Sequence, residues 1–316
     1  MKVLITGMDG FVGAYMAKLC LEKGAEVYGT TYKATTEGID AIKGKVTLIE
    51  CDIRDSKAVA GLVKDVKADW IIHLAAQTFV PSAWENPALT YNINIIGSLN
   101  LFEAVKNSEN YDPKILVACA ANEYGHIKKD EVPITEKTPF NPDNPYAVSK
   151  VAVDMMAYQY FLSKKMKTIR VRPFNIVGPE QSILFVASDF AKQIADIEAG
   201  KKEPVIMVGN LEAKRDFSDV RDAVKAYWLL LEKGVAGEVY NVCSGNGMSI
   251  QQLLDMLLKL STVKIEVRQD PKKMRPSDVP IIVGSYEKLK KLGWKPEIRL
   301  EETLKDILDY WRNKTR

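Results

Sequence analysis

The phenol of Tyr146 and the ammonium of Lys150 are the side chains whose types and spacing most directly predict chemistry. They stand four residues apart, directly behind Pro145, in the segment Tyr146-Ala-Val-Ser-Lys150. In a helix this spacing places both groups on one face. A neighbouring ammonium favours the phenolate and lowers the pKa of a tyrosine from about 10 toward neutrality, which makes the phenol a usable acid or base. We therefore predict that Tyr146 transfers a proton.

Three glycines near the amino end predict the molecule beside which that proton moves. Gly7, Gly10 and Gly13 recur at three-residue intervals, after an aliphatic run and at the start of a helical pattern. In that context glycines close a tight turn and let the backbone approach a pyrophosphate, while the helix N-terminus attracts its negative charge. We predict a dinucleotide site here, with Lys150 able to reach the nicotinamide ribose.

The end of the second predicted strand bears on the choice between NADP and NAD. An acidic residue about 20 positions beyond the glycines normally accepts hydrogen bonds from the adenosine ribose of NAD. Thr31 is neutral and Lys33 is basic, so the sequence favours NADP, and NAD stays possible because Lys33 could be a solvated loop charge. Asp52 could accept a hydrogen bond from the adenine amino group. The other predicted cofactor contacts are Phe11, Val12, Ile53, Leu74, Ala75, Ala76 and Pro173.

Short aliphatic strands alternate with helical segments through the first half of the chain. This pattern predicts an α/β fold of the Rossmann type, a doubly wound parallel sheet with helices on both faces. The predicted strands are Lys2–Thr6, Glu26–Thr31, Val46–Cys51, Trp70–Leu74, Ile115–Cys119 and Thr168–Arg172. The predicted helices are Phe11–Glu22, Ser56–Val66, Pro87–Asn107 and Pro145–Ser163.

The regular alternation of strands and helices ends after Arg172. From there we predict a smaller carboxyl-terminal α/β domain that binds the substrate. A Gly178-Pro179 turn is followed by a helical stretch to Gly200. Further strands are predicted at Val205–Val208 and Glu238–Val242, and helices at Val220–Glu232, Ile250–Leu260 and Glu301–Arg312. Residues 1–172 with about 217–245 would form the dinucleotide-binding domain, and about 173–216 with 246–316 the second.

Composition narrows the classes of partner. The 316 residues carry 44 basic and 41 acidic side chains, and a net charge of +3 predicts no general attraction to nucleic acid or anionic membranes. No apolar run approaches the ~18 residues of a membrane span. Four scattered cysteines without a C-x-x-C pair, and only two histidines, argue against a disulfide framework or a zinc site. We predict a cytoplasmic protein with no bound metal.

Longer motifs connect these features to a known family. They include Arg172-Pro-Phe-Asn175, Val208-Gly-Asn-Leu-Glu-Ala-Lys-Arg-Asp-Phe217 and Arg275-Pro-Ser-Asp278. Over nearly its whole length the chain resembles the extended short-chain dehydrogenases/reductases, also called the NAD-dependent epimerase/dehydratase family. Within them it resembles the branch of reductases and 4,6-dehydratases that act on GDP-linked sugars. The resemblance implies NADPH-dependent reduction of the 4-keto group of a GDP-linked 6-deoxyhexose.

One position departs from the family pattern. The family has Ser or Thr four residues before a Tyr-Gly pair, to polarise the sugar carbonyl or hydroxyl, and here that position is Ala120. Loss of one such donor typically costs ~10² to 10³ in rate, unless Asn122 or a water compensates. Family dehydratases carry an acid where Asn122 stands, so the chain fits a reductase better. The adjacent Glu123 is expected to face away from the substrate.

The resemblance also implies the substrate contacts. Arg215 and Arg275 lie in the diphosphate-binding motifs, where a guanidinium matches two phosphate oxygens. Asn175 would hold the phosphate or the sugar. The remaining predicted contacts are Thr78, Ser82, Gln193, Val208, Asn210 and Asp278. Gln193, Val208 and Asn210 favour guanine as the base.

Other functions and assemblies stay open. One alternative is a nucleotide-sugar 4,6-dehydratase or 4-epimerase that recycles a tightly bound cofactor. Another is a catalytically impaired nucleotide-binding protein, because Ala120 lacks the hydroxyl. In the family, helices such as Pro87–Asn107 and Pro145–Ser163 pair across a dimer, so a homodimer is expected, although the chain could bury the same side chains against its own sheet.

Overall fold

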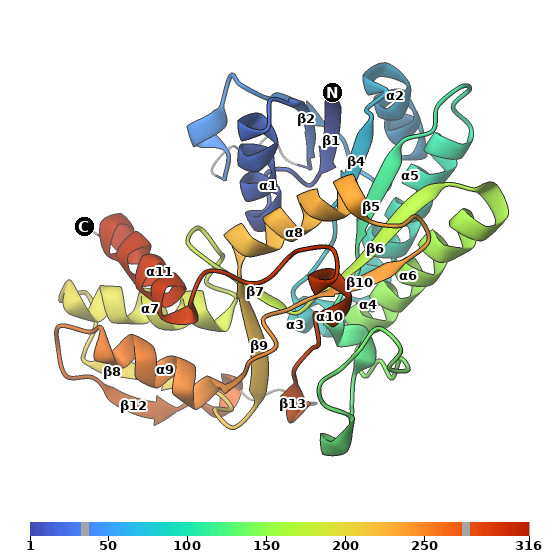
Figure 1. The fold of residues 1–316 in the computed structure, drawn as a ribbon. Coiled ribbons are helices and arrows are strands. Elements are labelled where there is room, and N and C mark those ends of the chain that lie inside the picture. The colour runs from blue at the N-terminus through green and yellow to red at the C-terminus, as the bar shows by residue number, and fades with distance from the viewer. Residues whose placement is uncertain (33–37, 274–278, 316) are drawn as a thin grey trace.

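Within the described residues, seven parallel strands form the central sheet (Figure 1). The computed structural model describes residues 1–32, 38–273 and 279–315. The strands are β1 (Lys2–Thr6), β2 (Glu26–Thr31), β3 (Thr47–Glu50), β4 (Trp70–His73), β5 (Lys114–Ala118), β6 (Lys167–Pro173) and β10 (Val239–Val242). Their order is β10-β6-β5-β4-β1-β2-β3. The order reverses at β1, and such sheets bind ligands beyond the carboxyl ends of the strands at this switch point.

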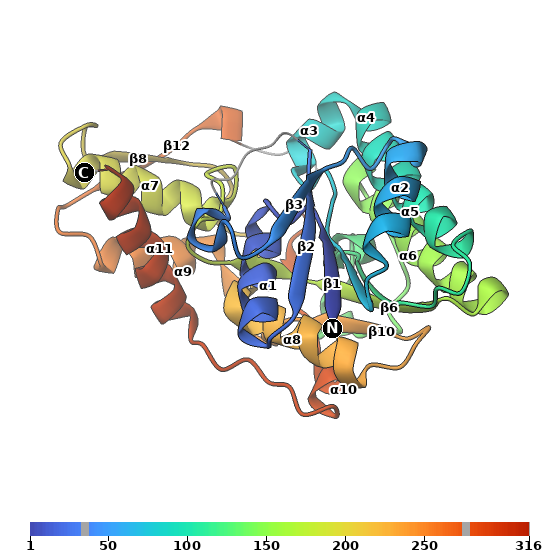
Figure 2. The ribbon, with the colours of Figure 1, turned by 90° about the horizontal axis from the view of Figure 1, so that it is seen from above.

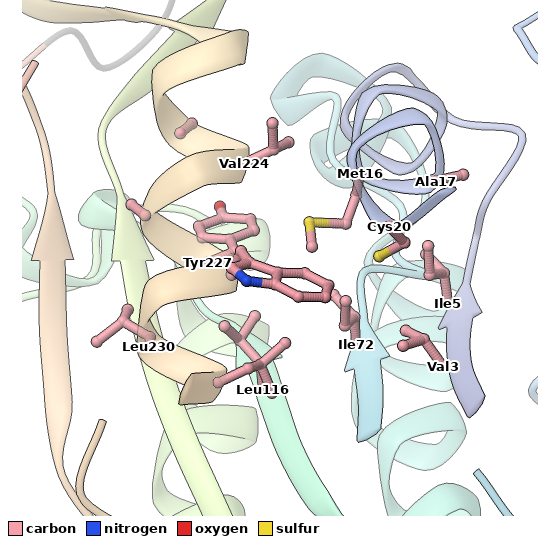
Figure 3. Packing of buried hydrophobic residues seen from close by; sticks show 14 of the residues in the cluster. Val3, Ile5, Met16, Ala17, Cys20, Ile72, Leu116, Val224, Tyr227 and Leu230 are labelled. Carbon is pink, nitrogen blue, oxygen red and sulfur yellow. The ribbon is translucent and has the colours of Figure 1, made fainter. Parts of the chain in front are cut away.

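Helices cover both faces of this sheet, as Figure 2 shows from above. One face is covered by α1 (Phe11–Glu22) and α8 (Val220–Lys233), and the other by α2 (Ser56–Val66), α5 (Gly97–Lys106) and α6 (Pro145–Lys164). Figure 3 shows Met16 of α1 and Tyr227 of α8 above the sheet, over Ile72 and Leu116. The doubly wound parallel fold predicted from the sequence is confirmed.

A second group of elements packs beside the sheet. Its helices are α7 (Val186–Glu198), α9 (Ile250–Lys259) and α11 (Leu300–Thr315), which share one apolar core. In the described part of the chain, four strands form a small sheet around β9: β7 (Asn175–Val177), β9 (Lys214–Asp219), β11 (Gly247–Ser249) and β13 (Ile281–Ile282). A further pair consists of β8 (Val205–Val208) and β12 (Glu266–Gln269). Strand β9 runs directly into α8, so the small sheet is continuous in sequence with a helix of the large one.

The segment predicted as one helix over Pro87–Asn107 is three elements. It comprises α4 (Pro87–Tyr91), a π-helical turn η2 (Asn92–Ile96) and α5. The wider turn places the side chain of Asn94 inward, where its Nδ2 donates to Gln77 O at 3.0 Å and to Ser149 Oγ at 2.9 Å. π-Helical turns within helices are common at functional sites.

Short elements complete the described chain. They are α3 (Val80–Glu85), α10 (Glu287–Lys290) and the 3-10 turns η1 (Asp40–Ile42), η3 (Ala121–Tyr124), η4 (Lys129–Glu131) and η5 (Pro271–Lys273). None of the helices in the described ranges is both long and apolar enough to cross a bilayer. The four cysteines are free and buried.

Candidate active site

The glycine turn lies between β1 and α1, at the switch point of the sheet. Gly7 has φ +69°, and a Cβ there would meet Ala75 Cα at 2.9 Å. A Cβ on Gly13 would lie 2.3 Å from Gly7 O. Gly10 caps α1 without a side-chain hydrogen bond, and the first turn of α1, which is described throughout, carries no acidic residue. The N–H groups in the first turn of α1 are therefore not capped by a side chain of Gly10 or opposed by an acid of that turn, which fits a dinucleotide pyrophosphate.

The side chains at the end of β2 bind the glycine turn. Thr30 Oγ1 accepts a hydrogen bond from Gly7 N at 3.0 Å, and Thr31 Oγ1 donates to Asp9 Oδ2 at 2.5 Å. Asp9 was not among the predicted site residues, although its place inside the glycine turn could have pointed to it. Lys33, on which the preference for NADP partly rested, lies outside the described residues.

The predicted adenine contact, Asp52, is bound by a neighbouring arginine. Both of its oxygens accept from the guanidinium of Arg54, at 2.5 to 3.0 Å. These bonds lower the pKa of the Asp52 carboxyl below its usual range. Arg54 also lies over the ring of Tyr32, 5.4 Å from its centroid.

Tyr146 and Lys150 lie in the first two turns of α6. Asn144 caps this helix and accepts from Ala147 N at 2.9 Å. Tyr146 lines the main cavity, whereas Lys150 Nζ lies beneath it, donates to Ala118 O at 2.7 Å, and stands 6.0 Å from the centroid of the tyrosine ring. Both side chains are buried.

The structure corrects the predicted ionisation of this pair. Burial, followed by the charges of Glu123 and Cys119, raises the pKa of Tyr146, and burial lowers the pKa of Lys150. The expectation that Lys150 lowers the tyrosine pKa is wrong for this arrangement, because desolvation exceeds the attraction of an ammonium that is bound to the carbonyl of Ala118. A neutral phenol is the form that donates a proton.

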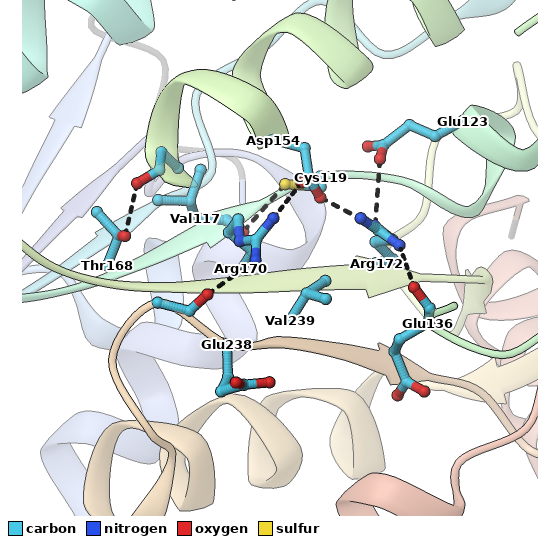
Figure 4. A network of polar contacts seen from close by, with 12 residues as sticks. Val117, Cys119, Glu123, Glu136, Asp154, Thr168, Arg170, Arg172, Glu238 and Val239 are labelled. Atoms are coloured by element: carbon cyan, nitrogen blue, oxygen red, sulfur yellow. Dashed lines mark hydrogen bonds and ion pairs between the residues drawn. The ribbon is translucent and has the colours of Figure 1, made fainter. Parts of the chain in front are cut away.

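A buried charge network joins α6, β6 and the turn η3 (Figure 4). Arg172 Nε donates to Asp154 Oδ2 at 2.9 Å and lies 3.3 Å from Glu123 Oε2. Arg170 binds the other oxygen of Asp154 at 2.7 Å. The Sγ atom of Cys119 and one oxygen from each carboxyl group lie within 4.8 Å of one another. Two guanidinium groups and two carboxyl groups therefore pack together in the interior.

Glu123 has its side chain turned into this network and away from the cavity, as predicted. Its Oε1 accepts from Ala120 N at 2.8 Å, and its Oε2 has no hydrogen-bond partner among the described residues. Burial and the proximity of Asp154 raise the pKa of Glu123 to about 8, against the opposing effect of Arg172.

A chain of buried hydrogen bonds joins the glycine-turn side of the sheet to α6. His73 lies between Thr6 Oγ1 at 2.8 Å and Ser98 Oγ at 2.9 Å, and burial lowers its pKa to about 3. Ser98 donates to Asn94 O, Asn94 donates to Ser149 Oγ, and Ser149 donates to Tyr146 O. The neutral imidazole and the π-helical turn thus fix the start of α6, and no local signal in the sequence indicated this.

A cavity of about 860 Å³ opens in front of Tyr146, between the large sheet and the second group of elements. The predicted site residues that line it are Thr78, Ala120, Asn122, Tyr146, Pro173, Asn175, Asn210 and Arg215. Its size is in the range of small-molecule sites. The cavity therefore brings together three of the predicted catalytic positions, Ala120, Asn122 and Tyr146, and part of the predicted substrate set, whereas Lys150 does not line it.

Other predicted substrate residues have different surroundings. Gln193 binds the backbone of Met207, with Oε1 accepting from N at 3.0 Å, and so ties α7 to β8. Val208 is buried and pairs with Gln269 of β12. Neither residue, nor Ser82, lines the cavity. Arg275 and Asp278 lie outside the described residues.

Arg215 is held on β9 by carbonyl groups. Its guanidinium donates to Val279 O at 2.7 Å and to Lys214 O at 2.9 Å. The next residue, Asp216, is buried and accepts from Ser244 N and Oγ, Gly245 N and Gly284 N, at 2.7 to 3.2 Å. These bonds fix the strand that presents Arg215 to the cavity.

The junction of β9 with α8 is also tightly bonded. Asp219 caps α8 by accepting from Arg221 N at 2.7 Å, and its second oxygen accepts from Thr303 Oγ1 of α11 at 2.7 Å. The guanidinium of Arg221 pairs with Asp306 at 2.9 Å. Three elements are thereby joined at one turn.

The sequence analysis missed several cavity residues. Aromatic side chains in its lining include those of Phe79, Trp84 and Phe185. Lys272 and Lys273 also line it, and Lys273 pairs with Asp189 at 2.7 Å. Two lysines one residue ahead of the Arg275-Pro-Ser-Asp278 motif are a signal for an anion site that was available in the sequence.

Comparisons with known proteins give the family. The family model described as GDP-mannose 4,6 dehydratase matches residues 4–307. The chain is 34% identical to the GDP-6-deoxy-D-mannose reductase of Pseudomonas aeruginosa, over 100% of this chain and 98% of that protein. It is 29% identical to the GDP-mannose 4,6-dehydratase of Yersinia enterocolitica, over 97% and 92%.

A solved structure agrees with this relationship. The structure of RMD from Pseudomonas aeruginosa complexed with NADPH superposes with a TM-score of 0.86 at 33% identity, over 99% of each chain. The match spans the glycine turn, the Tyr-Lys pair and the cavity-lining strand β9. The chain belongs to the GDP-mannose 4,6 dehydratase family, within the extended short-chain dehydrogenases/reductases.

Proposed function

We propose that the protein reduces the 4-keto group of a GDP-linked 6-deoxyhexose, with NADP(H) as cofactor. The observation that carries this proposal is the buried phenol of Tyr146, which lines a cavity large enough for a nucleotide sugar. Asn122 lines the same cavity, at the position where dehydratases of the family carry an acid. The full-length similarity to a GDP-6-deoxy-D-mannose reductase and to an NADPH complex supports it.

The residues of the chain divide the work in the following way. Tyr146 donates a proton to the keto oxygen, and its raised pKa keeps that proton in place until charge develops on the oxygen. Asn122 supplies an amide donor near the position where Ala120 lacks a hydroxyl. Lys150 holds the ribose of the nicotinamide. The dinucleotide, bound at the glycine turn, supplies the hydride.

The substrate nucleotide would occupy the part of the cavity lined by the second group of elements. Arg215 and Lys272 bring positive charge to the diphosphate. Asn175 and Asn210 offer amide groups to the phosphate, sugar or base, and Thr78 a hydroxyl to the hexose. For Arg275 and Asp278, which share one sequence motif, contact with the substrate remains a prediction from that motif.

Consumption of NADPH on addition of GDP-4-keto-6-deoxymannose tests the proposal directly. Tyr146→Phe should lower kcat by ~10² to 10⁴ while leaving GDP binding intact, because only proton donation is removed. Tyr310→Phe, on α11 and outside the cavity lining, serves as the matched control. Product formation without net cofactor oxidation would instead identify a dehydratase or an epimerase.

The missing hydroxyl at Ala120 favours a second candidate, a nucleotide-binding protein that has lost catalytic activity. A nucleotide-binding protein without activity would bind GDP and the dinucleotide yet leave the keto sugar unchanged. The retained Tyr146 and Lys150 argue against it, since binding alone has no use for a buried phenol over an ammonium.

We also propose a homodimer in the cytoplasm. Apolar side chains stand exposed on the outer faces of η2 and α6, including Ile96, Met155, Tyr158 and Leu162, of which Leu162 is 50% exposed. A second copy would bury them. Four free, buried cysteines fit a reducing compartment. Sedimentation of the wild type and of Leu162→Glu tests the assembly, with a monomeric wild type as the contrary result.

A further inference from the structure

Trp84 and Glu85, at the carboxyl end of α3, are exposed residues that line the main cavity. Trp84 is 46% exposed, although an indole is among the side chains that gain most from burial. Within the part of the chain that the structure describes, neither side chain makes a hydrogen bond, an ion pair or a ring contact. Both therefore have surface available to a ligand of the cavity.

The packing of α3 places these two residues near the proton donor. Ala83, the residue before Trp84, is fully buried and packs with Ala120 and Tyr146. Side chains of successive helical residues point about 100° apart, so the burial of Ala83 leaves Trp84 at the edge of this contact. The indole therefore lines the part of the cavity next to Tyr146.

Hydrogen bonds fix the start of α3 relative to α6. The side chain of Asn94 binds both N and O of Gln77, at 2.8 and 3.0 Å, and donates to Ser149 of α6 at 2.9 Å. The side chain of Gln77 donates to the carbonyl of Phe79, directly before α3, at 3.0 Å. Trp84 is thus positioned by the backbone that carries it and not by a contact of its own side chain.

Glu85 differs from the other acids of the cavity in having no partner. Three acids line the cavity among the described residues, and Asp189 is paired with Lys273 at 2.7 Å. Asp143 accepts from Asn144 Nδ2 at 2.8 Å. The oxygens of Glu85 make no such bond in the described chain, so they are available as acceptors.

The type of these side chains indicates which part of a nucleotide sugar they bind. A diphosphate is favoured beside Arg215 and Lys272, which line the cavity from β9 and η5, and disfavoured beside a carboxylate. A hexose is uncharged, and its hydroxyl groups donate to carboxylate oxygens. The C–H groups on one face of its ring pack on the face of an indole.

A guanine also fits an indole and a carboxylate, but its distance from the reacting carbon excludes it here. The base of a nucleotide sugar is separated from the hexose by a ribose and two phosphates. Because α3 packs against Tyr146, the group that meets Trp84 and Glu85 is the one that also meets the proton donor. That group is the hexose.

We propose that Trp84 and Glu85 are specificity-determining residues for the hexose. The indole packs on a C–H face of the sugar ring, and the carboxylate accepts hydrogen bonds from its hydroxyl groups. The inference rests on the proposed function in requiring a nucleotide-linked hexose beside Tyr146. It assigns the hexose contact of α3 to these two residues in place of Ser82, which does not line the cavity.

The test measures the binding of GDP-mannose and of GDP by calorimetry, without added dinucleotide, so it does not depend on reduction. In Trp84→Ala we expect the affinity for GDP-mannose to fall roughly fivefold or more, because the packing of a large aromatic side chain is lost. The affinity for GDP should be unchanged. Trp84→Phe keeps an aromatic ring and should restore most of the loss. Glu85→Ala should weaken GDP-mannose without weakening GDP.

A matched control and the contrary outcomes complete the experiment. Leu89→Ala removes an exposed apolar side chain of α4 outside the cavity lining and should leave both constants unchanged. Thermal unfolding verifies that each variant folds. The proposal is overturned if the GDP-mannose-to-GDP affinity ratio in both alanine variants equals that of the wild type, including the case in which both ligands weaken equally. Absence of sugar reduction together with the expected change in this ratio would overturn the proposed function alone.

Discussion

The carboxyl group of Glu123 accepts a hydrogen bond from the backbone N–H of Ala120 at 2.8 Å. Ala120, which lacks the hydroxyl of the family, therefore has its backbone bound by a buried acid on the side away from the cavity. Ala120, Ala121 and Asn122 line the cavity in this segment, and Glu123 holds its backbone through the N–H of Ala120. The side chain at position 120 and the acid at position 123 can therefore be substituted separately.

Restoring the hydroxyl should accelerate the reaction. In Ala120→Ser a donor enters the cavity wall beside Tyr146, and a gain in kcat on the order of 10² is expected because one aligned hydrogen bond to a developing oxyanion is worth about that much. Steady-state kinetics with saturating cofactor measures it. Ala121→Ser, one position along, should give no comparable gain, and an unchanged rate in the Ala120 variant would mean that no donor is missing.

Removing the charge of Glu123 should change how stability depends on pH. The pKa of Glu123 is raised to about 8 from an ordinary 4.5, so the folded state binds this proton more tightly than the unfolded chain. The stabilisation is complete below about pH 4.5 and is lost as the pH rises through 8. Glu123→Gln retains an acceptor for Ala120 N and has no proton to lose.

The Tm of the wild type should therefore fall more than that of Glu123→Gln between pH 6 and pH 8.5. Thermal denaturation at both pH values gives the comparison. Parallel Tm changes in the two proteins would show that Glu123 does not titrate in this range. Glu212→Gln, an exposed acid, should follow the wild type.

Loss of Arg215 should weaken substrate binding selectively. Charge-assisted hydrogen bonds contribute about 1.5–3 kcal/mol, which corresponds to roughly 10- to 100-fold in KM for the nucleotide sugar. In Arg215→Ala kcat should change much less than KM, because the role proposed for the guanidinium is to bind the diphosphate and not to act at the reacting carbon. Lys214→Ala, the exposed neighbour on β9, is the control, and an equal effect of both variants would assign the loss to general charge.

Asp216 should matter for stability more than for chemistry. Its carboxylate accepts from four donors, and an amide in Asp216→Asn would present N–H groups to some of them. We expect a loss of about 1–3 kcal/mol in the free energy of unfolding for a buried donor left unsatisfied. Urea denaturation measures the loss, and an unchanged midpoint would contradict the assigned role of this carboxylate.

The fold was accessible from the sequence because its signals are local. The strands and helices of the large sheet follow from runs of aliphatic residues and from helical periodicity, and the turn at Gly7 and Gly10 follows from spacing. The break in the helix after Tyr91 did not, because it depends on Asn94 reaching Ser149, 55 residues away in sequence. Periodicity carries no information about such a partner.

The site was only partly accessible for the same reason. Tyr146, Lys150 and Ala120 were found from motif and spacing. The bond of Asp9 to Thr31 and the ion pair of Glu123 with Arg172 arise from the sheet order, which brings distant segments together. The pKa shift of Tyr146 was predicted in the wrong direction. The sequence shows the neighbouring lysine charge but not the burial of the phenol, and in the folded chain the effect of burial is larger.

The bonded turn between β9 and α8 has a consequence for how ligands are received. With Asp219 joining α8 to α11, the second group of elements cannot move away from the large sheet at this point without breaking the bonds to Arg221 and Thr303. The cavity between them is therefore formed when the polypeptide folds. Little further ordering of the backbone at this junction is needed when a ligand binds, so adjustment to different ligands is left to the side chains that line the cavity.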